Sequence, residues 1–291
     1  MPASLDSIVA ATRQRLSQRR SGLASARISG GRRDSGLAAL EAAAAGHTPR
    51  GFRTELRRVA RDRSAVAVIA ELKKASPSRG LIRAEFRPTE LARELEAAGA
   101  SALSVLTDEE FFQGSLGNLQ DASAAVKIPC LRKDFIVDGF QLIEARANAA
   151  DAVLLIVAAL SVQELDGLAA AARLQGLDVL CEVHDGEELQ RALDAGCDLI
   201  GVNTRDLRTF KVDLETAFRL AEKFPAGVVR VAESGIHSAE DVARLREAGY
   251  DAFLVGESLM RAERPGDALR ELLVPSTRYP VASQRQDFTG C

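Results

Sequence analysis

The sequence predicts the α/β fold class, as a closed (β/α)8 barrel (a TIM barrel) with an N-terminal helical extension. Three observations predict this fold. The chain has 291 residues, of which 46% are hydrophobic and 27% charged, a composition that can form a sizeable core. One helix-to-strand junction recurs four times, and eight short apolar runs alternate with stretches of helical period.

The recurring junction is a helix that ends in a small residue and runs through an acid or a serine into an apolar strand. Its copies are Glu96–Leu106, Ala147–Ile156, Asp194–Asn203 and Glu247–Gly256. Three copies have glycine where a helix end favours a left-handed residue, and the second copy has Ala149 there. Each copy therefore predicts a connection from a helix to a strand.

The eight apolar runs are predicted strands. Most are hydrophobic almost throughout, which is typical of strands buried on both faces of a parallel sheet. They are Ala65–Leu72, Ala102–Leu106, Ile128–Lys133, Ala152–Val157, Asp178–Val183, Leu199–Asn203, Val228–Glu233 and Ala252–Val255.

Helices are predicted between the strands by period and by their end residues. Pro88, Ser161 and Ser238 are placed to begin the helices Thr89–Ala98, Val162–Gln175 and Ala239–Ala248. A doubly wound open sheet is the alternative architecture. Against it, SPSRG rather than GxGxxG follows the first strand, so the dinucleotide-binding pattern is absent there.

Three regions are expected: a helical extension over residues 1–48, the barrel over 49–274 and a polar tail over 275–291. Ser4–Arg20 is amphipathic and Leu37–Ala45 is a second candidate helix, so we expect both to pack on the barrel. One face of the first helix carries Leu5, Ile8, Val9, Thr12 and Leu16.

Composition excludes several classes of function. Lys plus Arg total 38 against 41 for Asp plus Glu, so the net charge of −3 argues against a nucleic-acid partner. The four cysteines form no CxxC pair and the three histidines are scattered, so no metal site is expected, and free thiols suggest a cytoplasmic setting. The longest apolar run, Ala152–Leu160, is too short to span a membrane. No unpaired strand edge or apolar stripe remains, so we expect a monomer.

Charged or polar residues end five of the eight strands, at the positions where barrel enzymes carry their chemistry. They are Glu71 and Lys73, Lys133, Glu182, Asn203 with Arg205 following, and Glu233. A strand that emerges into solvent often ends on a charge, but five strands doing so favour a shared site. Glu182 lies between apolar neighbours and would need a cationic partner to offset its desolvation.

Two loops add candidate ligand contacts. Ser234-Gly235 and Gly256-Glu257 follow the last two strands, where barrels commonly bind phosphate, although these glycines are equally consistent with ordinary turns. Phe111 and Phe112 lie in a polar loop, where they could line a pocket for a flat ring or pack as a small satellite core. We interpret His184 and His237 as surface residues.

Taken together, these residues resemble the indole-3-glycerol phosphate synthase family over roughly residues 5–272. The resemblance rests on motifs in the family's order: IAELKKASPSRG, SVLTDEEFFQGS, LRKDF, CEVH, GVNTRDL, AESGI and FLVGESLM. It implies ring closure of 1-(2-carboxyphenylamino)-1-deoxyribulose 5-phosphate, with loss of CO2 and water, to indole-3-glycerol phosphate in tryptophan biosynthesis.

The resemblance also implies roles for residues. Catalytic roles fall to Glu71, Lys73, Lys133, Glu182, Asn203 and Glu233, with Lys133 as the general acid of ring closure. Substrate contacts fall to Ser76, Phe111, Phe112, Phe135, Arg205 and Ser234, and phosphate contacts to Gly235, Gly256 and Glu257. No cofactor is expected, and the partner is a phosphorylated small molecule. The loop Lys74–Phe86 is expected to close over it.

Two other functions stay open. Another phosphate-binding barrel, a phosphoribosyl isomerase or an aldolase with Lys133 as Schiff base, is the nearest alternative. Carboxylates nearby would raise the pKa of Lys133 and disfavour the Schiff base. A non-catalytic barrel that binds a phosphorylated metabolite is the other.

Overall fold

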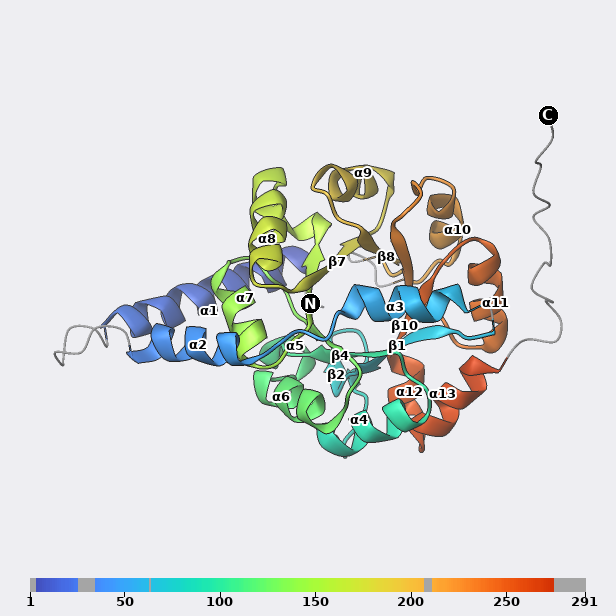
Figure 1. The fold of residues 1–291 in the computed structure, drawn as a ribbon, viewed down its shortest axis with the longest axis horizontal. Coiled ribbons are helices and arrows are strands. Elements are labelled where there is room, and N and C mark those ends of the chain that lie inside the picture. Colours follow the sequence, from blue (N-terminus) through green and yellow to red (C-terminus); the bar gives the residue numbers. More distant parts are fainter. Residues whose placement is uncertain (1–3, 26–34, 63, 207–210, 275–291) are drawn as a thin grey trace.

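The computed structural model describes residues 4–25, 35–62, 64–206 and 211–274, and it confirms the predicted barrel (Figure 1). Eight parallel strands close in the order β1-β10-β9-β8-β7-β6-β5-β4. They are β1 (Ala67–Leu72), β4 (Ala102–Leu106), β5 (Cys130–Lys133), β6 (Ala152–Ile156), β7 (Asp178–Val183), β8 (Leu199–Asn203), β9 (Val229–Glu233) and β10 (Ala252–Val255). Each predicted strand is present, with ends that differ by at most two residues.

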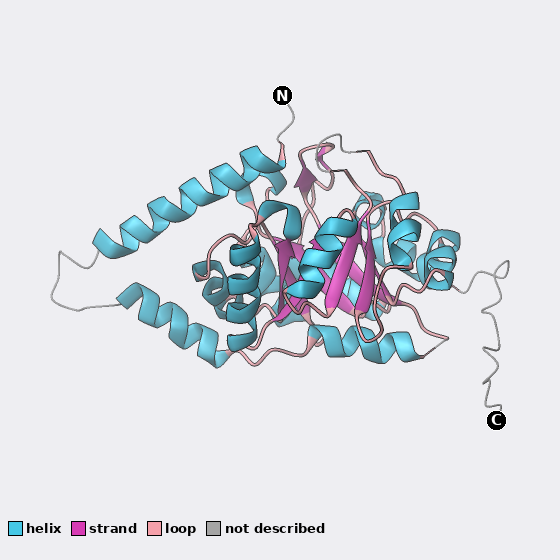
Figure 2. Ribbon diagram, turned by 90° about the horizontal axis from the view of Figure 1, so that it is seen from above, coloured by secondary structure: helices cyan, strands magenta, loops and turns pink. Residues whose placement is uncertain are grey.

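Helices cover the outside of the barrel and connect its strands (Figure 2). They are α4 (Pro88–Ala97), α6 (Leu116–Ala125), α7 (Phe140–Ala147), α8 (Val162–Leu174), α9 (Gly186–Asp194), α10 (Glu215–Ala221), α11 (Ala239–Glu247) and α13 (Pro265–Leu273). Short helices α5 (Glu109–Phe112), η1 (Val157–Ala159) and α12 (Glu257–Arg261) lie in the loops that follow β4, β6 and β10. Pro88 opens α4, and Ser161 and Ser238 form capping boxes, as predicted.

The repeated junctions have the predicted geometry. The small residue is left-handed in all four copies, and at Ala149, where φ is 61°, an alanine adopts a conformation that usually requires glycine. The acid of the junction has a function that the pattern alone does not reveal. Asp151 accepts a hydrogen bond from the backbone N–H of Cys130, and Asp251 accepts one from that of Arg230. These carboxylates therefore join neighbouring strands at the N-terminal end of the barrel.

Two helices, α1 (Leu5–Ser25) and α2 (Ser35–Gly46), form the N-terminal extension and reach beyond the barrel on one side (Figures 1 and 2). The predicted apolar face of α1 is confirmed, because Ile8, Thr12 and Leu16 are buried. The helix α2 packs against α7. The polar tail expected over 275–291 lies outside the described residues.

The patterns in the sequence did not predict α3 (Phe52–Arg61), which precedes the first strand. Phe52 and Leu56 are fully buried and pack with inward-facing residues of the barrel, such as Ile69 and Val231. Val59 extends this apolar face and packs against the same part of the core, while arginines and a glutamate fill most of the other positions. The helix therefore closes the N-terminal end of the barrel.

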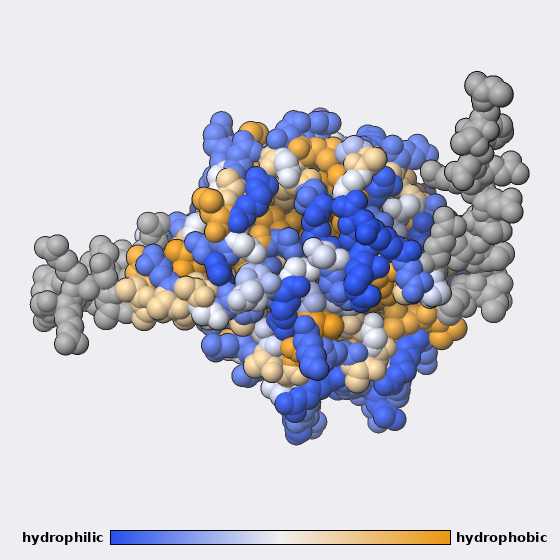
Figure 3. All heavy atoms as spheres, in the orientation of Figure 1, coloured by the Kyte–Doolittle hydropathy of each residue, from blue (hydrophilic) through white to orange (hydrophobic). Residues whose placement is uncertain are grey.

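The apolar core has two parts. The larger lies between the barrel and its surrounding helices, and the smaller fills the interior of the barrel. The surface in Figure 3 is mostly hydrophilic, with hydrophobic residues in scattered groups. None of the helices in the described segments is long and apolar enough to cross a membrane.

The cysteines correct one interpretation. Cys181 and Cys197 are paired as a disulfide, whereas the sequence patterns led us to treat both as free thiols. Their Cα atoms are 6.6 Å apart, within the range that a disulfide spans. Cys130 is free and buried.

Candidate active site

A cavity opens at the carboxyl ends of the barrel strands. Parallel strands place their last residues at the same end of the barrel, so side chains far apart in the sequence converge there. Most of the predicted site residues line it: Glu71, Lys73, Ser76, Phe112, Lys133, Phe135, Glu182, Asn203, Arg205, Glu233, Ser234 and Glu257. Gly235 and Gly256 line a smaller hollow that shares Glu71, Lys73, Arg205, Ser234 and Glu257 with the cavity.

Lys133, the last residue of β5, lies among carboxylates. Its Nζ is 3.1 Å from Glu182 Oε2 and 3.7 Å from Glu233 Oε2. Burial acts to lower the pKa of Lys133, but the charges of Glu182, Glu233 and Glu71 outweigh burial and hold that pKa above its usual value. The lysine is therefore a charged proton donor in a largely desolvated position.

Glu71 and Lys73 share one face of β1, as their alternation predicts, and form an ion pair of 2.8 Å. Burial acts to raise the pKa of Glu71, but Lys73 and Lys133 outweigh it, so the pKa lies below its usual value. Gly256 gives this carboxylate room, because a Cβ at that position would lie 2.5 Å from Glu71 Oε1. Gly256 thus has a steric function within the site.

Glu182, on β7, is held on several sides. Lys133 approaches one of its oxygens, and Asn203 Nδ2 donates to the other over 3.1 Å. Asn203 Oδ1 in turn accepts from the Ser234 hydroxyl over 2.8 Å and from the Arg205 backbone N–H over 3.1 Å. Burial acts to raise the pKa of Glu182, but Lys133 and His184 outweigh it, so this carboxylate stays ionised.

The pKa of Glu233, on β9, is shifted in the opposite direction from that of Glu182. Burial, and next the charge of Glu182, raise its pKa to about 8. Its Oε1 has no hydrogen-bond partner among the described residues. That oxygen lies against Gly201, where a Cβ would be only 2.0 Å away. The sequence analysis did not single out Gly201, although a glycine inside a strand is a known sign of close approach.

His184 does not lie at the surface as we expected. Its side chain is only 15% exposed, and its Nδ1 is 2.9 Å from Glu188 Oε2 while its Nε2 is 3.4 Å from Glu182 Oε1. Glu188 follows His184 by four residues and lies in the first turn of α9. The sequence spacing of His184 did not predict its contact with Glu182. His237 is exposed, as expected.

Apolar side chains form another wall of the cavity. Phe112 and Phe135 face each other with ring centroids 6.2 Å apart, and Leu5 and Ile8 of α1 also line the cavity. Phe111 does not line it, and its backbone N–H instead donates to Asp108 Oδ1. Of the expected aromatic pair, Phe112 therefore lies at the cavity in this structure, and the substrate contact of Phe111 stays a prediction. The contribution of α1 to the cavity was not predicted.

Guanidinium groups gather beside the smaller hollow. The Glu257 carboxylate lies 3.1 Å from Arg79 Nε, 3.4 Å from Arg205 Nη2 and 3.3 Å from Arg261 Nε. The buried hydroxyls of Ser76 and Ser258 have no hydrogen-bond partner among the described residues. This end of the site thus offers cations and hydroxyl groups that suit an anionic ligand.

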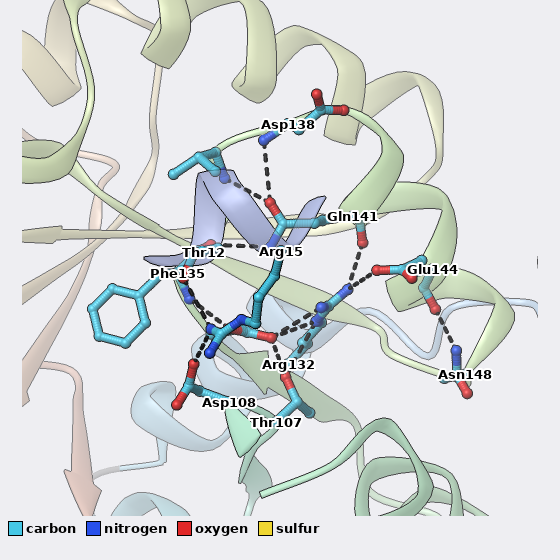
Figure 4. A network of polar contacts seen from close by, with 12 residues as sticks. Thr12, Arg15, Thr107, Asp108, Arg132, Phe135, Asp138, Gln141, Glu144 and Asn148 are labelled. Atoms are coloured by element: carbon cyan, nitrogen blue, oxygen red, sulfur yellow. Dashed lines mark hydrogen bonds and ion pairs between the residues drawn. The ribbon is translucent and has the colours of Figure 1, made fainter. Parts of the chain in front are cut away.

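A polar network surrounds Arg132, the residue that precedes Lys133 on β5 (Figure 4). Arg132 points out of the barrel, where it bonds to Asp134 Oδ2 over 2.9 Å and to the Gln141 carbonyl over 2.7 Å. Arg15 of α1 reaches Asp108, whose side chain is fully buried, over 2.7 Å. The network therefore fixes the strand end that carries Lys133 and joins it to the loops around the cavity.

The fold and the site define a (β/α)8-barrel enzyme with a lysine enclosed by carboxylates, apolar surface on one side and a cationic hollow on another. No cluster of three or more potential metal ligands is present in the described part of the chain. Such a site suits proton-transfer chemistry on an anionic molecule that contains a ring.

Comparison with known proteins identifies the family. The family model for indole-3-glycerol phosphate synthase matches residues 17–272. An indole-3-glycerol phosphate synthase of Koribacter versatilis is 64% identical over 234 residues, covering 80% of this chain and 89% of the relative. One of Dechloromonas aromatica is 51% identical, covering 81% and 90%. The chain therefore belongs to the indole-3-glycerol phosphate synthase family.

Solved structures of more distant proteins support the fold alone. A thiamine phosphate pyrophosphorylase from Pyrococcus furiosus matches with a TM-score of 0.55 at 19% identity, over 71% of this chain and 93% of that chain. A second match, KGPDC from Streptococcus mutans, has a TM-score of 0.54 at 14% identity, over 72% and 95%.

Proposed function

We propose that this protein converts 1-(2-carboxyphenylamino)-1-deoxyribulose 5-phosphate to indole-3-glycerol phosphate, with loss of CO2 and water. Membership of the family supports this reaction. The single structural observation that carries it is Lys133, 3.1 Å from Glu182 and 3.7 Å from Glu233, in a cavity with an apolar wall and a cationic hollow.

Ring closure is assigned to Lys133. The aromatic carbon that bears the carboxylate attacks the ketone carbon, a C–C bond forms, and the ketone oxygen gains negative charge. Lys133 donates a proton to that oxygen as general acid, and neighbouring carboxylates keep the lysine charged beforehand. Loss of CO2 then returns its bonding electrons to the ring.

Dehydration needs an acid for the departing hydroxyl and a base for the proton that is lost. Glu182 and Glu71 are ionised and suit the base, while Lys73 suits the acid. Glu233, whose pKa is raised to about 8, lies 3.7 Å from Lys133 Nζ and orients the ammonium, while Asn203 orients Glu182. Coupled groups in one cavity can exchange these roles.

The apolar and polar side chains that line the cavity orient the substrate. Its aromatic ring packs on Phe112 and Phe135, and its phosphate lies in the hollow of Gly235 and Gly256. Backbone N–H groups and Ser234 contact the phosphate, and Arg205 pairs with an anionic group of the substrate. Glu257 contributes its backbone N–H, because its carboxylate would repel the phosphate. Ser76 contributes its hydroxyl.

Neither alternative function has equal support. A Schiff base at Lys133 requires a neutral amine, which the surrounding carboxylates oppose. A barrel that only binds metabolites would leave the buried lysine and carboxylates without a chemical role.

Indole fluorescence tests the reaction directly, because the chain contains no tryptophan and the background is low. We expect a rise in fluorescence with the synthetic substrate, and a loss of at least about 1000-fold in kcat for Lys133→Ala. Lys127→Ala, at an exposed position, is the matched control and should keep full activity. Turnover that survives in Lys133→Ala would remove the assigned role, and tight binding without any turnover would favour the non-catalytic barrel.

We further infer that the protein acts as a monomer in the cytoplasm. The large hydrophobic residues that are exposed in the described segments come from four separate parts of the chain, and the two that share α8 lie at its opposite ends: Leu81, Val162, Leu174, Val212 and Val274. Light scattering tests the monomer. Thiol labelling in freshly lysed cells tests the location, and a Cys181–Cys197 disulfide found intact there would argue against the cytoplasm.

A further inference from the structure

His184 lies behind the carboxylate of Glu182, on the side away from Lys133. Its Nε2 is 3.4 Å from Glu182 Oε1, and its Nδ1 is 2.9 Å from Glu188 Oε2. Its backbone N–H also donates to Glu188 Oε2 over 2.8 Å. Glu188 therefore holds the imidazole, and the buried Nε2, which has no hydrogen-bond partner among the described residues, faces Glu182 at ion-pair distance. The side chain of His184 is 15% exposed and that of Glu188 16% exposed.

We propose that His184 is a positioning residue for the reaction. As an imidazolium held by Glu188, it orients Glu182 and keeps it ionised while Lys133 gives up its proton. The proposal rests on the proposed function, because Glu182 and Lys133 are the groups that it serves. The sequence analysis and the roles assigned above leave His184 without a function.

The need for a second cation follows from the order of proton transfers. In the resting site Lys133 stabilises the Glu182 carboxylate across 3.1 Å. Once Lys133 has protonated the ketone oxygen it is neutral, and Glu182 would then tend to take up a proton itself. A cation on the opposite side, which does not take part in the transfer, opposes that uptake.

The charges that face His184 support the imidazolium. Glu182 of β7 and Glu188 of α9 contact it directly, and Glu233 of β9 and Lys133 of β5 lie beyond Glu182. Burial acts to lower the pKa of His184, but Glu182 and Glu188 outweigh burial and raise it to about 10. Asp185, the next residue, accepts from the backbone N–H groups of Glu187 and Glu188 and so fixes the start of α9.

Kinetics of His184→Asn test the role. Without the imidazolium, Glu182 takes up a proton more readily, so the acid limb of kcat should rise by about one to three pH units. The pKa of Glu182 lies below its usual value in the wild type, so we expect kcat to fall at least about tenfold at pH 5 and to recover much of this loss at pH 8, with KM changed little. Glu188→Gln should shift the limb in the same direction by less, and Glu187→Gln, at an exposed position on the same turn, should not shift it.

Nitrogen-15 NMR of the imidazoles tests the charge without any turnover. The chain has only three histidines, so the signal absent from His184→Asn identifies His184. We expect both ring nitrogens to be protonated at pH 8 in the folded protein and not in urea. A neutral His184 at pH 8, or an activity loss equal at pH 5 and 8, would overturn the proposal. If the wild type shows no turnover, the proposed function fails while the NMR result still decides the charge.

Discussion

Glu182 and Glu233 show how one barrel sets two identical side chains to different tasks. Both carboxyls are buried at the ends of strands and both approach Lys133. Asn203 and His184 also face Glu182 and lower its pKa. Glu233, by contrast, has one oxygen without a hydrogen-bond partner among the described residues, and the nearby charge of Glu182 raises its pKa. The difference in partners, rather than in burial, lowers the pKa of Glu182 and raises that of Glu233.

Gly201 controls the place of Glu233. An added Cβ would lie 2.0 Å from Glu233 Oε1, so Gly201→Ala must push that carboxyl toward Lys133. We expect kcat to fall about 100-fold, because displacements near 1 Å in a catalytic site cost about that much. Overpacking should also lower the free energy of unfolding by about 1–3 kcal/mol. Steady-state kinetics and urea denaturation measure the two effects.

Gly167→Ala is the matched control, since a Cβ there would meet nothing within 4 Å and the residue lies inside α8. It should keep full activity and gain a little stability. Unchanged kcat in Gly201→Ala would mean that Glu233 is not positioned as we argue.

The ends of the helices are the features of secondary structure that the sequence predicts most regularly. Glycine or alanine before each acid predicts where helices stop, and Ser161 and Ser238 predict where two begin. The helix α3 escaped prediction although Phe52, Leu56 and Val59 form an apolar face, because Gly51, in the left-handed region, precedes it without a side-chain cap and arginines dominate its sequence. Its burial against the barrel, which local patterns do not contain, stabilises it.

Ala149 is the one junction where the conformation and the residue disagree. With φ at 61° it occupies a region that costs an alanine about 1–2 kcal/mol, whereas glycine adopts it freely but loses more entropy on folding. Ala149→Gly should therefore raise the free energy of unfolding by about 0.5–1 kcal/mol. Chemical denaturation measures this, and a loss of stability would show that the methyl group packs usefully.

At the scale of the whole molecule, the features that could be predicted were those that local sequence patterns encode directly. The strands and their terminal charges were predicted because buried parallel strands are visibly apolar and barrels gather strand ends at one face. The roles of side chains such as Gly201, His184 and Arg132 were not, since each depends on a neighbour brought close only by the closed barrel. Residues of α1 in the cavity wall were missed for the same reason.

Stability of the whole molecule should fall as the pH rises from 7 to 9. The pKa of His184 is raised from 6.5 to about 10, and that of Glu233 from 4.5 to about 8, so the folded protein retains protons that the unfolded chain releases. A raised pKa contributes stability that is complete below the unfolded value and is lost as the pH passes through the folded value. The window is therefore 6.5 to 10 for His184 and 4.5 to 8 for Glu233.

Each pH unit within a window corresponds to about 1.4 kcal/mol per group. Between pH 7 and 9 His184 stays within its window for two units and Glu233 for one, so the two groups together predict a loss of about 4 kcal/mol. Urea denaturation at the two pH values measures it. His184→Asn should have a shallower dependence than the wild type, because one of the two retained protons is gone, and Glu233→Gln should do the same through the other. A wild-type stability that is flat or rises over this interval would mean that these protons are not held in the folded site, and that Glu233 is ionised as Glu182 is.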